Sequence, residues 1–254
     1  MIPAYRESPY LEDCIRSVKE QTVPGKVLIA TSTPNDHISG IADKYDIEVI
    51  EHDPGGLAGD WNDAVKFAGT KYVTIAHQDD TYEKTFREEV LTAMASAEDP
   101  LISFTDYAEI RGEEYVTDNQ NLIIKKLLLF PLRNKKAWKS RFLRRRALSM
   151  GNPICCPSVT INTELVEQPL FVNNMKSNID WQAWEMLSRR CGSFVYIHKV
   201  LMAHRIHQES TTTEVIGENK RKDEDIFMFC KFWPKWVAKL IEHFYIKSEK
   251  SNRI

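Results

Sequence analysis

The stretch YVTIAHQDDTYE, residues 72–83, decides how the first half of the chain is interpreted. A β-rich apolar run over residues 72–76 ends abruptly in a polar turn that contains Asp79 and Asp80. Short apolar runs that end in polar turn residues are typical of buried strands. Two adjacent carboxylates therefore stand at the C-terminal end of a predicted strand, and this placement needs a physical reason.

Strands and helices alternate around this stretch. The pattern predicts a helix that begins near Ser8, with Pro9 in its first turn. The other predicted helices cover residues 38–45, 60–68 and 83–97. The predicted strands cover residues 2–4, 26–30, 48–50, 72–76 and 101–107, and further strands are predicted later in the chain at residues 158–162, 194–197 and 201–205. This β-α-β alternation predicts an α/β fold with a mostly parallel, doubly wound sheet and helices on both faces. Ligands of such sheets bind beyond the carboxyl ends of the strands, where Asp79 and Asp80 stand.

Bulk composition narrows the class of protein. The chain has 254 residues, of which 43% are hydrophobic and 28% are charged, which suits one ordinary globular domain. No stretch approaches the roughly 18 uninterrupted apolar residues that span a bilayer. The charged start lacks the apolar core of a signal peptide, so we expect no leader. Five cysteines without zinc-type spacing indicate reduced thiols and a cytoplasmic location.

A basic segment interrupts the alternation. Residues 119–163 contain ten Lys and Arg but no Asp or Glu, interleaved with apolar groups such as residues 127–130. Its ordinary interpretation is a solvated charged face. The alternative is a surface for an anionic membrane or a lipid-diphosphate acceptor. Nucleic acid would also suit this charge, but no recognition motif accompanies it, so we expect no nucleic-acid partner.

The candidate chemical groups each allow more than one interpretation. Asp79 and Asp80 could cap the following helix, form a charged turn, or hold Mg²⁺ or Mn²⁺. Asp180, in NIDWQAWEML, could be an N-cap or a general base positioned against aromatic rings. His204 and His207 are three residues apart; either could be an ordinary polar surface residue, and no cysteine nearby supports a structural zinc site.

A glycine-rich segment, HDPGGLAGDWNDAV, leads into the helix predicted at residues 60–68. It matches neither G-x-G-x-x-G nor a P-loop, which disfavours dinucleotide binding. The segment could be a flexible turn, or it could let the backbone approach a phosphate or a sugar closely.

Four segments carry a family resemblance when they are taken in order. They are IPAYRESPYLEDCIRSVKEQT, AGDWNDAVKFAGTKYVTIAHQDD, NIDWQAWEMLSRR and MAHRIHQEST, between residues 2 and 211. Together they resemble the family 2 inverting glycosyltransferases of the GT-A fold. The resemblance implies transfer of a sugar from a nucleotide-diphosphate sugar to a hydroxyl acceptor with inversion, in cell-surface polysaccharide or glycan biosynthesis. It also implies Mg²⁺ or Mn²⁺ as cofactor.

The resemblance assigns roles residue by residue. Asp180 matches the catalytic base. Asp79, Asp80 and His207 match positions that meet the metal or the diphosphate. The donor nucleotide-sugar is expected to contact eight residues: Pro3, Ala4, Tyr5, Glu7, Ser32, Asp60, Asn62 and Asp79.

Two departures from the family pattern concern the donor. His77 replaces the first acid of the Asp-x-Asp motif, and Thr31 and Ser32 stand where an acidic pair often reads the nucleobase. We expect a UDP-sugar, with dTDP and GDP donors as alternatives. The acceptor is expected to be a glycan or a lipid-linked molecule. Peripheral contact with an anionic membrane through residues 125–146 would place the protein at the inner face of the membrane.

These expectations divide the chain into four parts of a single GT-A domain. Residues 1–118 form the nucleotide-sugar-binding half, and residues 119–157 form a basic, partly apolar helical insert. Residues 158–216 form the acceptor-side half with the catalytic base, and residues 217–254 form C-terminal helices.

Two other functions stay open at this stage. One is a catalytically degenerate protein that binds nucleotide-sugars or partners, which the His77 replacement keeps open. The other is a sugar nucleotidyltransferase, which would carry a glycine-rich basic signature near its first strand; IPAYRES lacks one.

Overall fold

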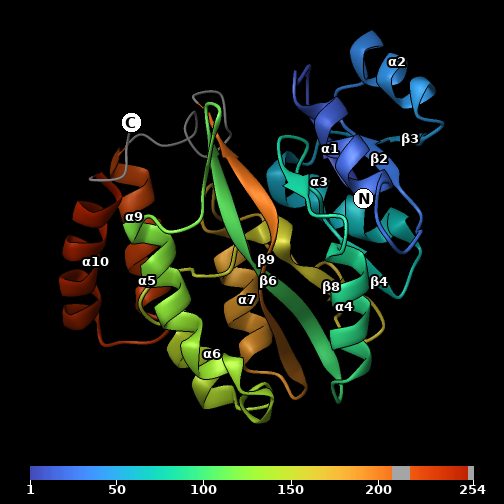
Figure 1. The fold of residues 1–254 in the computed structure, drawn as a ribbon. Coiled ribbons are helices and arrows are strands. Elements are labelled where there is room, and N and C mark those ends of the chain that lie inside the picture. The colour runs from blue at the N-terminus through green and yellow to red at the C-terminus, as the bar shows by residue number, and fades with distance from the viewer. Residues whose placement is uncertain (208–217, 251–254) are drawn as a thin grey trace.

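The computed structural model describes residues 1–207 and 218–250 (Figure 1). The N-terminal part contains a three-stranded parallel sheet in the order β1-β2-β3. Its strands are β1 (Ile2–Ala4), β2 (Leu28–Thr31) and β3 (Glu48–Glu51). The helices that connect or follow these strands are α1 (Leu11–Lys19), α2 (Asp36–Lys44) and α3 (Gly56–Ala68). The predicted alternation is confirmed here, although α3 begins four residues before the predicted residue 60 because the glycine-rich segment forms its first turn.

A second sheet has mixed strand directions, in the order β4-β8-β6-β9-β5 with β7 paired to β6. Its strands are β4 (Tyr72–Thr74), β5 (Thr81–Tyr82), β6 (Pro100–Arg111), β7 (Glu114–Val116), β8 (Thr160–Asn162) and β9 (Ser193–Ile206). The long strands β6 and β9 are parallel, whereas β8 is antiparallel to both β4 and β6. The Met1 ammonium donates to the Thr74 carbonyl (3.1 Å), and the Ala76 N–H donates to the Met1 carbonyl (2.9 Å), so the two sheets adjoin.

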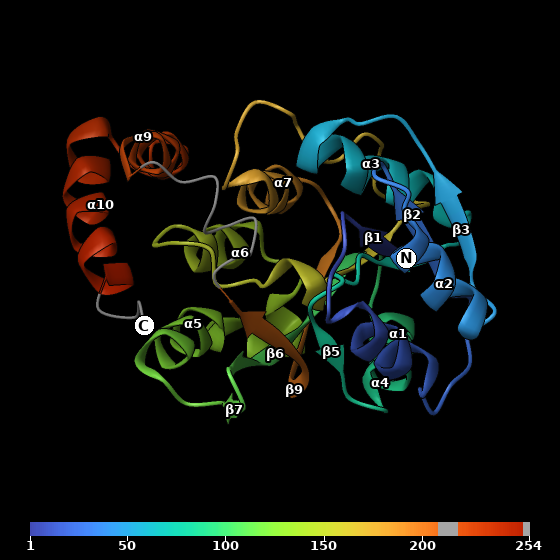
Figure 2. The same ribbon diagram turned by 90° about the horizontal axis from the view of Figure 1, so that it is seen from above.

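Helices cover both faces of the sheets, which confirms the predicted fold class (Figures 1 and 2). Side chains alternate along β9, so Phe194 and Tyr196 pack in one hydrophobic core while Val195 and Ile197 pack in the other. The first core includes side chains of α3 and of the C-terminal helices, and the second includes those of α1, α2 and α4 (Phe86–Ala95).

Two predicted elements differ in extent from the structure. The strands predicted at residues 194–197 and 201–205 are one continuous strand, β9. The register between β6 and β9 shifts around Asp106, and the exposed His198 and Lys199 opposite this shift gave the sequence the appearance of a turn. Helix α4 begins at Phe86, three residues after the predicted start, because residues 84–85 form a turn between β5 and the helix.

The basic segment folds into short helices. They are α5 (Gln120–Leu129), η1 (Phe130–Arg133), η2 (Lys135–Ala137) and α6 (Arg141–Leu148), followed by η3 (Cys156–Ser158). The side chains of Asn119 and Ser140 accept hydrogen bonds from backbone N–H groups in the first turns of α5 and α6. The insert is therefore helical, as predicted.

The arginine run at residues 144–146 does not form a free charged surface. Arg144 is fully buried, donates to the carbonyls of Gly192 (2.9 Å) and Arg190 (2.7 Å), and lies over the Phe194 ring. Arg145 pairs with the buried Glu185 on α7, and Arg146 lies over the ring of Trp233. These contacts correct the expectation that this run supplies charge to a membrane surface. The guanidinium groups of these three arginines contact carbonyl, carboxylate and aromatic groups of the protein itself.

The remaining helices are α7 (Ile179–Ser188), α9 (Glu218–Phe229) and α10 (Lys235–Lys250). Helices α9 and α10 lie at one end of the molecule, and α7 lies nearer its middle (Figure 2). The Trp181 ring of α7 meets the Phe229 ring of α9 edge-on, with 5.1 Å between centroids. Among residues 1–207 and 218–250, no helix combines the length and apolarity that crossing a bilayer requires.

Candidate active site

A cavity of about 1450 Å³ lies beyond the carboxyl ends of several strands. Tyr5 follows β1, Ser32 follows β2, His52 follows β3, and the turn containing Asp79 follows β4. The cavity is lined by ten of the eleven predicted site residues: Pro3, Ala4, Tyr5, Glu7, Ser32, Asp60, Asp79, Asp80, Asp180 and His207. The structure therefore brings these residues, which are far apart along the chain, together around one cavity.

The donor end of this cavity is formed by β1, β2 and α3. The Gln78 side chain accepts from the Tyr5 N–H (3.0 Å) and donates to the Tyr5 carbonyl (3.1 Å), which extends the pairing of β1 beyond its last residue. Tyr5 itself stays 46% exposed beside the cavity. Asp60 accepts from the Ser32 hydroxyl (3.2 Å) and from the Gly55 N–H (3.3 Å), so α3 is tied to the end of β2.

Asn62 has a different place from the expected one. Its side-chain amide donates to the Phe171 carbonyl (2.8 Å) and accepts from the Phe171 N–H (2.9 Å). Asn62 lies outside the set of cavity-lining residues. The structure therefore gives Asn62 the role of a clamp between α3 and the segment before α7, because both ends of its amide are already used.

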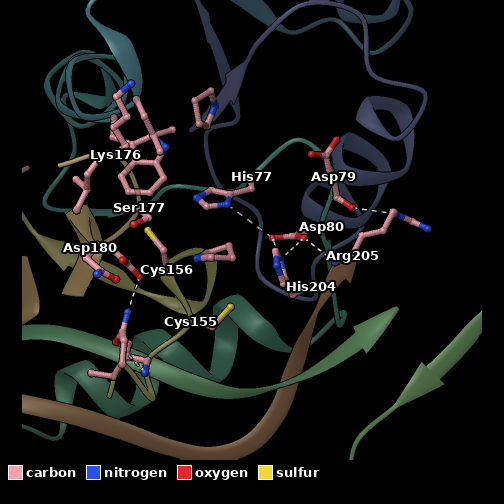
Figure 3. A pocket seen from close by; sticks show the side chains of 18 of the residues that line it. His77, Asp79, Asp80, Cys155, Cys156, Lys176, Ser177, Asp180, His204 and Arg205 are labelled. Carbon is pink, nitrogen blue, oxygen red and sulfur yellow. Dashed lines mark hydrogen bonds and ion pairs between the residues drawn. The ribbon is translucent and has the colours of Figure 1, made fainter. Parts of the chain in front are cut away.

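Asp80 anchors the end of β9 to the turn after β4 (Figure 3). Its side chain is fully buried, and it accepts from His204 Nδ1 (2.9 and 3.2 Å) and from the Arg205 N–H (2.9 Å). Burial acts to raise the pKa of Asp80, but His204, His77 and the Arg205 N–H together hold it below its usual value. The pKa of His204 is raised, since the attraction of Asp80 outweighs the effect of burial.

Asp79 points away from this anchor (Figure 3). Its carboxylate accepts from the Ser8 hydroxyl (2.6 Å), and its Oδ2 lies 3.2 Å from His207 Nε2. That nitrogen is buried and makes no hydrogen bond to any residue that the structure describes. A carboxylate oxygen facing an imidazole nitrogen without a hydrogen bond fits two ligands of a divalent cation whose other ligands come from substrate and water. No group of three or more such ligands occurs among residues 1–207 and 218–250.

His77 is an uncharged wall of the same cavity. Its ring stacks on Trp61 with 5.2 Å between centroids, and its Nδ1 lies 4.0 Å from Asp80 Oδ2. Burial lowers the pKa of His77, so the ring is neutral near pH 7. The replacement of an acid by His77 therefore removes one negative charge from the end of β4.

Asp180 lies across the cavity from Asp79 and Asp80, in the first turn of α7 (Figure 3). Its carboxylate accepts from the Trp181 N–H (2.8 Å) and from Asn152 Nδ2 (2.7 Å). Burial raises the pKa of Asp180 to about 6, despite these two hydrogen bonds. A carboxylate with a pKa this close to neutrality can accept a proton near physiological pH.

Sequence reasoning missed Asn152 and undervalued His204. Asn152 lies in the loop after α6 and donates a hydrogen bond to the carboxylate of Asp180. The local sequence Gly-Asn-Pro at residues 151–153 gives no indication of this contact. His204 had the appearance of a polar surface residue, yet it is the partner of the buried Asp80. Cys155 and Cys156 also line the cavity, and burial raises the pKa of both thiols, so they stay uncharged.

Comparison with known proteins is consistent with this geometry. Residues 1–166 match the family described as Glycosyl transferase family 2. The structure is similar to that of S. aureus TarS, residues 1–349, in complex with UDP-GlcNAc, with 15% identity and a TM-score of 0.63 over 99% of this chain and 72% of that chain. It is also similar to the mannosyltransferase PcManGT from Pyrobaculum calidifontis in complex with GDP-Man and Mn²⁺, with 12% identity and a TM-score of 0.62 over 100% of this chain and 74% of that chain. Among curated proteins, none matches the sequence.

The family match and the fold identify a glycosyltransferase of the GT-A type. The chain belongs to glycosyl transferase family 2, as its sequence resemblance implied.

Proposed function

We propose that this protein is a metal-dependent, inverting glycosyltransferase that moves a sugar from a nucleotide-diphosphate sugar to a hydroxyl acceptor. The observation that carries the proposal is the pair of facing groups in one cavity. Asp79 and His207 are available to a cation on one side, and Asp180, with its pKa raised to about 6, lies on the other. The nucleotide-sugars bound by the two similar structures support a donor of this class.

The donor nucleotide is placed at the end of the cavity that β1 and β2 form. Pro3, Ala4 and Tyr5 wall the base and ribose, Glu7 lies at the rim, and the Ser32–Asp60 pair lies beneath. UDP is our first candidate, and dTDP and GDP are the alternatives. The similar structures hold UDP-GlcNAc and GDP-Man, so this fold accommodates more than one base.

Asp79 and His207 are the proposed protein ligands of Mg²⁺ or Mn²⁺. Mn²⁺ accompanies GDP-Man in the Pyrobaculum structure. Such an ion would supply positive charge to the diphosphate that leaves the sugar. The contribution of Asp80 differs from the direct ligation that we expected, because both of its oxygens are occupied by His204 and Arg205. We assign Asp80 to positioning the turn that carries Asp79.

Asp180 is the proposed general base. An acceptor hydroxyl is a weak nucleophile until its proton is removed as the new bond forms. The carboxylate of Asp180 takes this proton, while the hydroxyl attacks the anomeric carbon and the bond to the diphosphate breaks. A single displacement of this kind inverts the configuration. Asn152 and the Trp181 N–H fix the orientation of the carboxylate, which keeps it aimed during the step.

Thermal unfolding with UDP, GDP and dTDP, each with and without Mn²⁺, tests donor binding directly. A ligand at one hundred times its dissociation constant stabilises the fold by about 2.7 kcal/mol. We expect one nucleotide to raise the melting temperature only with Mn²⁺, and we expect Asp79→Ala to abolish that rise. Asp43→Ala, an exposed acid on α2, is the matched control and should keep it. No shift with any nucleotide in folded protein would contradict the proposal.

The cellular role and location extend the proposal. We propose that the enzyme works in the cytoplasm, in cell-surface polysaccharide or glycan synthesis, and contacts the inner face of the membrane through residues 125–146. Leu127 and Phe130 support such contact, being 69% and 59% exposed, whereas Arg144 is buried. A degenerate binding protein is the alternative function that the His77 replacement keeps open. Such a protein would bind the nucleotide without turnover.

A further inference from the structure

The cavity has a second arm whose walls differ from those of the donor end. Beyond Asp180 it is lined by residues of α5, of the loop after α6, and of α10. Figures 1 and 2 both show α5 and α10 at the end of the molecule away from the β1–β3 sheet. The donor residues, Asp180 and this arm belong to one continuous cavity. A molecule lying in the arm can therefore reach Asp180 without entering the donor end.

Most of the side chains that this arm exposes are apolar. On α5, Ile124 and Leu128 line it at a four-residue spacing, so they share one face of the helix. On α10, Leu240 and Phe244 line it with the same spacing. Ile124, Leu240 and Phe244 are 41%, 54% and 62% exposed, and Met150 between the helices is 44% exposed. Apolar surface of this extent inside a cavity favours a ligand with an apolar group.

A lysine of α5 stands where the apolar walls approach Asp180. Lys125 lines the cavity from α5, donates from Nζ to the Tyr107 hydroxyl (2.7 Å), and lies close enough to Asp180 to lower the pKa of that carboxyl. Among the side chains that the structure describes, in residues 1–207 and 221–245, no carboxylate forms an ion pair with Lys125. An ammonium group without a carboxylate partner is complementary to an anionic group on a ligand.

We infer that this arm binds the acceptor, and that the acceptor is an anionic amphiphile: a hydroxyl-bearing head, a phosphate beside it, and a hydrocarbon chain. The head lies at Asp180, the phosphate at Lys125, and the chain between α5 and α10. The inference rests on the proposed function, because it takes Asp180 as the base that the acceptor hydroxyl must reach. The donor occupies the opposite end, so the acceptor approaches through the arm with the apolar walls.

Binding of hexyl, octyl and decyl phosphate, each below its micelle concentration, tests this inference by titration calorimetry. Each buried methylene should raise the affinity about fourfold until the groove is filled. Leu240→Ser and Ile124→Ser should each weaken decyl phosphate at least fivefold. Ile123→Ser is the matched control, because Ile123 is on α5, is 55% exposed and lies outside both the cavity and the proposed membrane segment; it should leave the affinity unchanged.

The charge requirement is tested separately. Lys125→Gln should reduce the affinity for decyl phosphate about tenfold and leave the affinity for decanol unchanged. An affinity that does not depend on chain length would overturn the inference. Equal losses of affinity in Ile123→Ser and Leu240→Ser would show nonspecific adsorption of lipid and would overturn the inference. Self-association of the protein that buries Leu240, with no reversal by decyl phosphate, would also overturn the inference. That result would identify this face as a contact between two copies of the chain.

The outcome can be separated from that of the proposed function. Calorimetry with alkyl phosphates needs neither donor nor turnover, and the nucleotide titration needs no amphiphile. If a nucleotide binds with Mn²⁺ but alkyl phosphates do not, the acceptor inference fails alone. If alkyl phosphates bind as described but no nucleotide does, the groove is an amphiphile site and the proposed transferase fails.

Discussion

Replacing Asp180 by Asn should stabilise the fold at neutral pH while it removes the activity. Burial raises the pKa of Asp180 from 3.8 to about 6, so the ionised carboxylate costs up to about 3 kcal/mol of folding free energy at about pH 8. We reduce this destabilisation to about 2–3 kcal/mol, because the Asp180 side chain is partly open to the cavity and solvent screens its charge. The variant has one oxygen for two donors, Asn152 and the Trp181 N–H, and losing one hydrogen bond costs about 1 kcal/mol.

The net gain is therefore about 1–2 kcal/mol at about pH 8, or a rise of about 3–6 °C in melting temperature for a domain of this size. The pH dependence follows from the raised pKa. A carboxyl whose folded pKa exceeds its unfolded value stabilises the fold at low pH, and this contribution is lost as the pH rises through the folded pKa. The advantage of Asp180→Asn should therefore shrink to about zero near pH 4.

Urea unfolding followed by circular dichroism, repeated across this pH range, measures the difference directly. The exposed Asp43→Asn should show no such pH dependence. Turnover should fall by about 10²–10⁴ in Asp180→Asn, and in the wild type it should rise with pH through about 6 as Asp180 loses its proton. Lower stability of the variant near pH 8, or a difference that stays constant with pH, would refute the burial argument. Retained turnover would remove Asp180 from the role of base.

Three other replacements separate binding from folding. Asp79→Asn should change the unfolding free energy by less than about 1 kcal/mol, because Asp79 is near the surface, yet abolish the Mn²⁺-dependent stabilisation by nucleotide. Asp80→Ala should cost about 3–5 kcal/mol in urea unfolding, because it leaves His204 without its buried partner. Arg144→Ala should cost a similar amount by leaving two carbonyls without donors, whereas the exposed Arg141→Ala should cost less than about 0.5 kcal/mol by the same assay.

The fold was predictable where the sequence alternates regularly. Strands β1 to β4 and the helices between them follow from apolar periodicity and turn residues, because local patterns fix local elements. The direction of β8 was not predictable, since three apolar residues have the same pattern in a parallel or an antiparallel pair. The burial of Arg144 was also not predictable, because a charged side chain is ordinarily expected to be exposed. The two backbone carbonyls that accept its hydrogen bonds lie 46 and 48 residues later in the chain, and no local pattern indicates them.

The sequence could predict which residues would come together, but not the hydrogen bonds that hold them. Residues at the carboxyl ends of strands converge whatever their spacing in sequence, so Tyr5, Ser32 and Asp79 could be placed together. The hydrogen bonds of Asn62 and Asn152 depend on loops from distant parts of the chain, and no local pattern encodes them. The family match ends at residue 166, so the assignment of Asp180 and His207 rests on the geometry of the cavity.

The two adjacent carboxylates after β4 can now be given separate roles. Asp80 turns inward, where His204 Nδ1 and the Arg205 N–H satisfy both of its oxygens and fix the end of β9 against the turn. Because β9 is held there, His207, two residues beyond Arg205, faces Asp79, and its Nε2 lies 3.2 Å from the carboxylate. The fixed position of Asp80 therefore allows Asp79 to face His207, which is 128 residues later in the chain. If this coupling holds, Asp80→Asn should weaken Mn²⁺-dependent nucleotide binding in protein that remains folded, although Asp80 is assigned to positioning the turn and not to binding the ion.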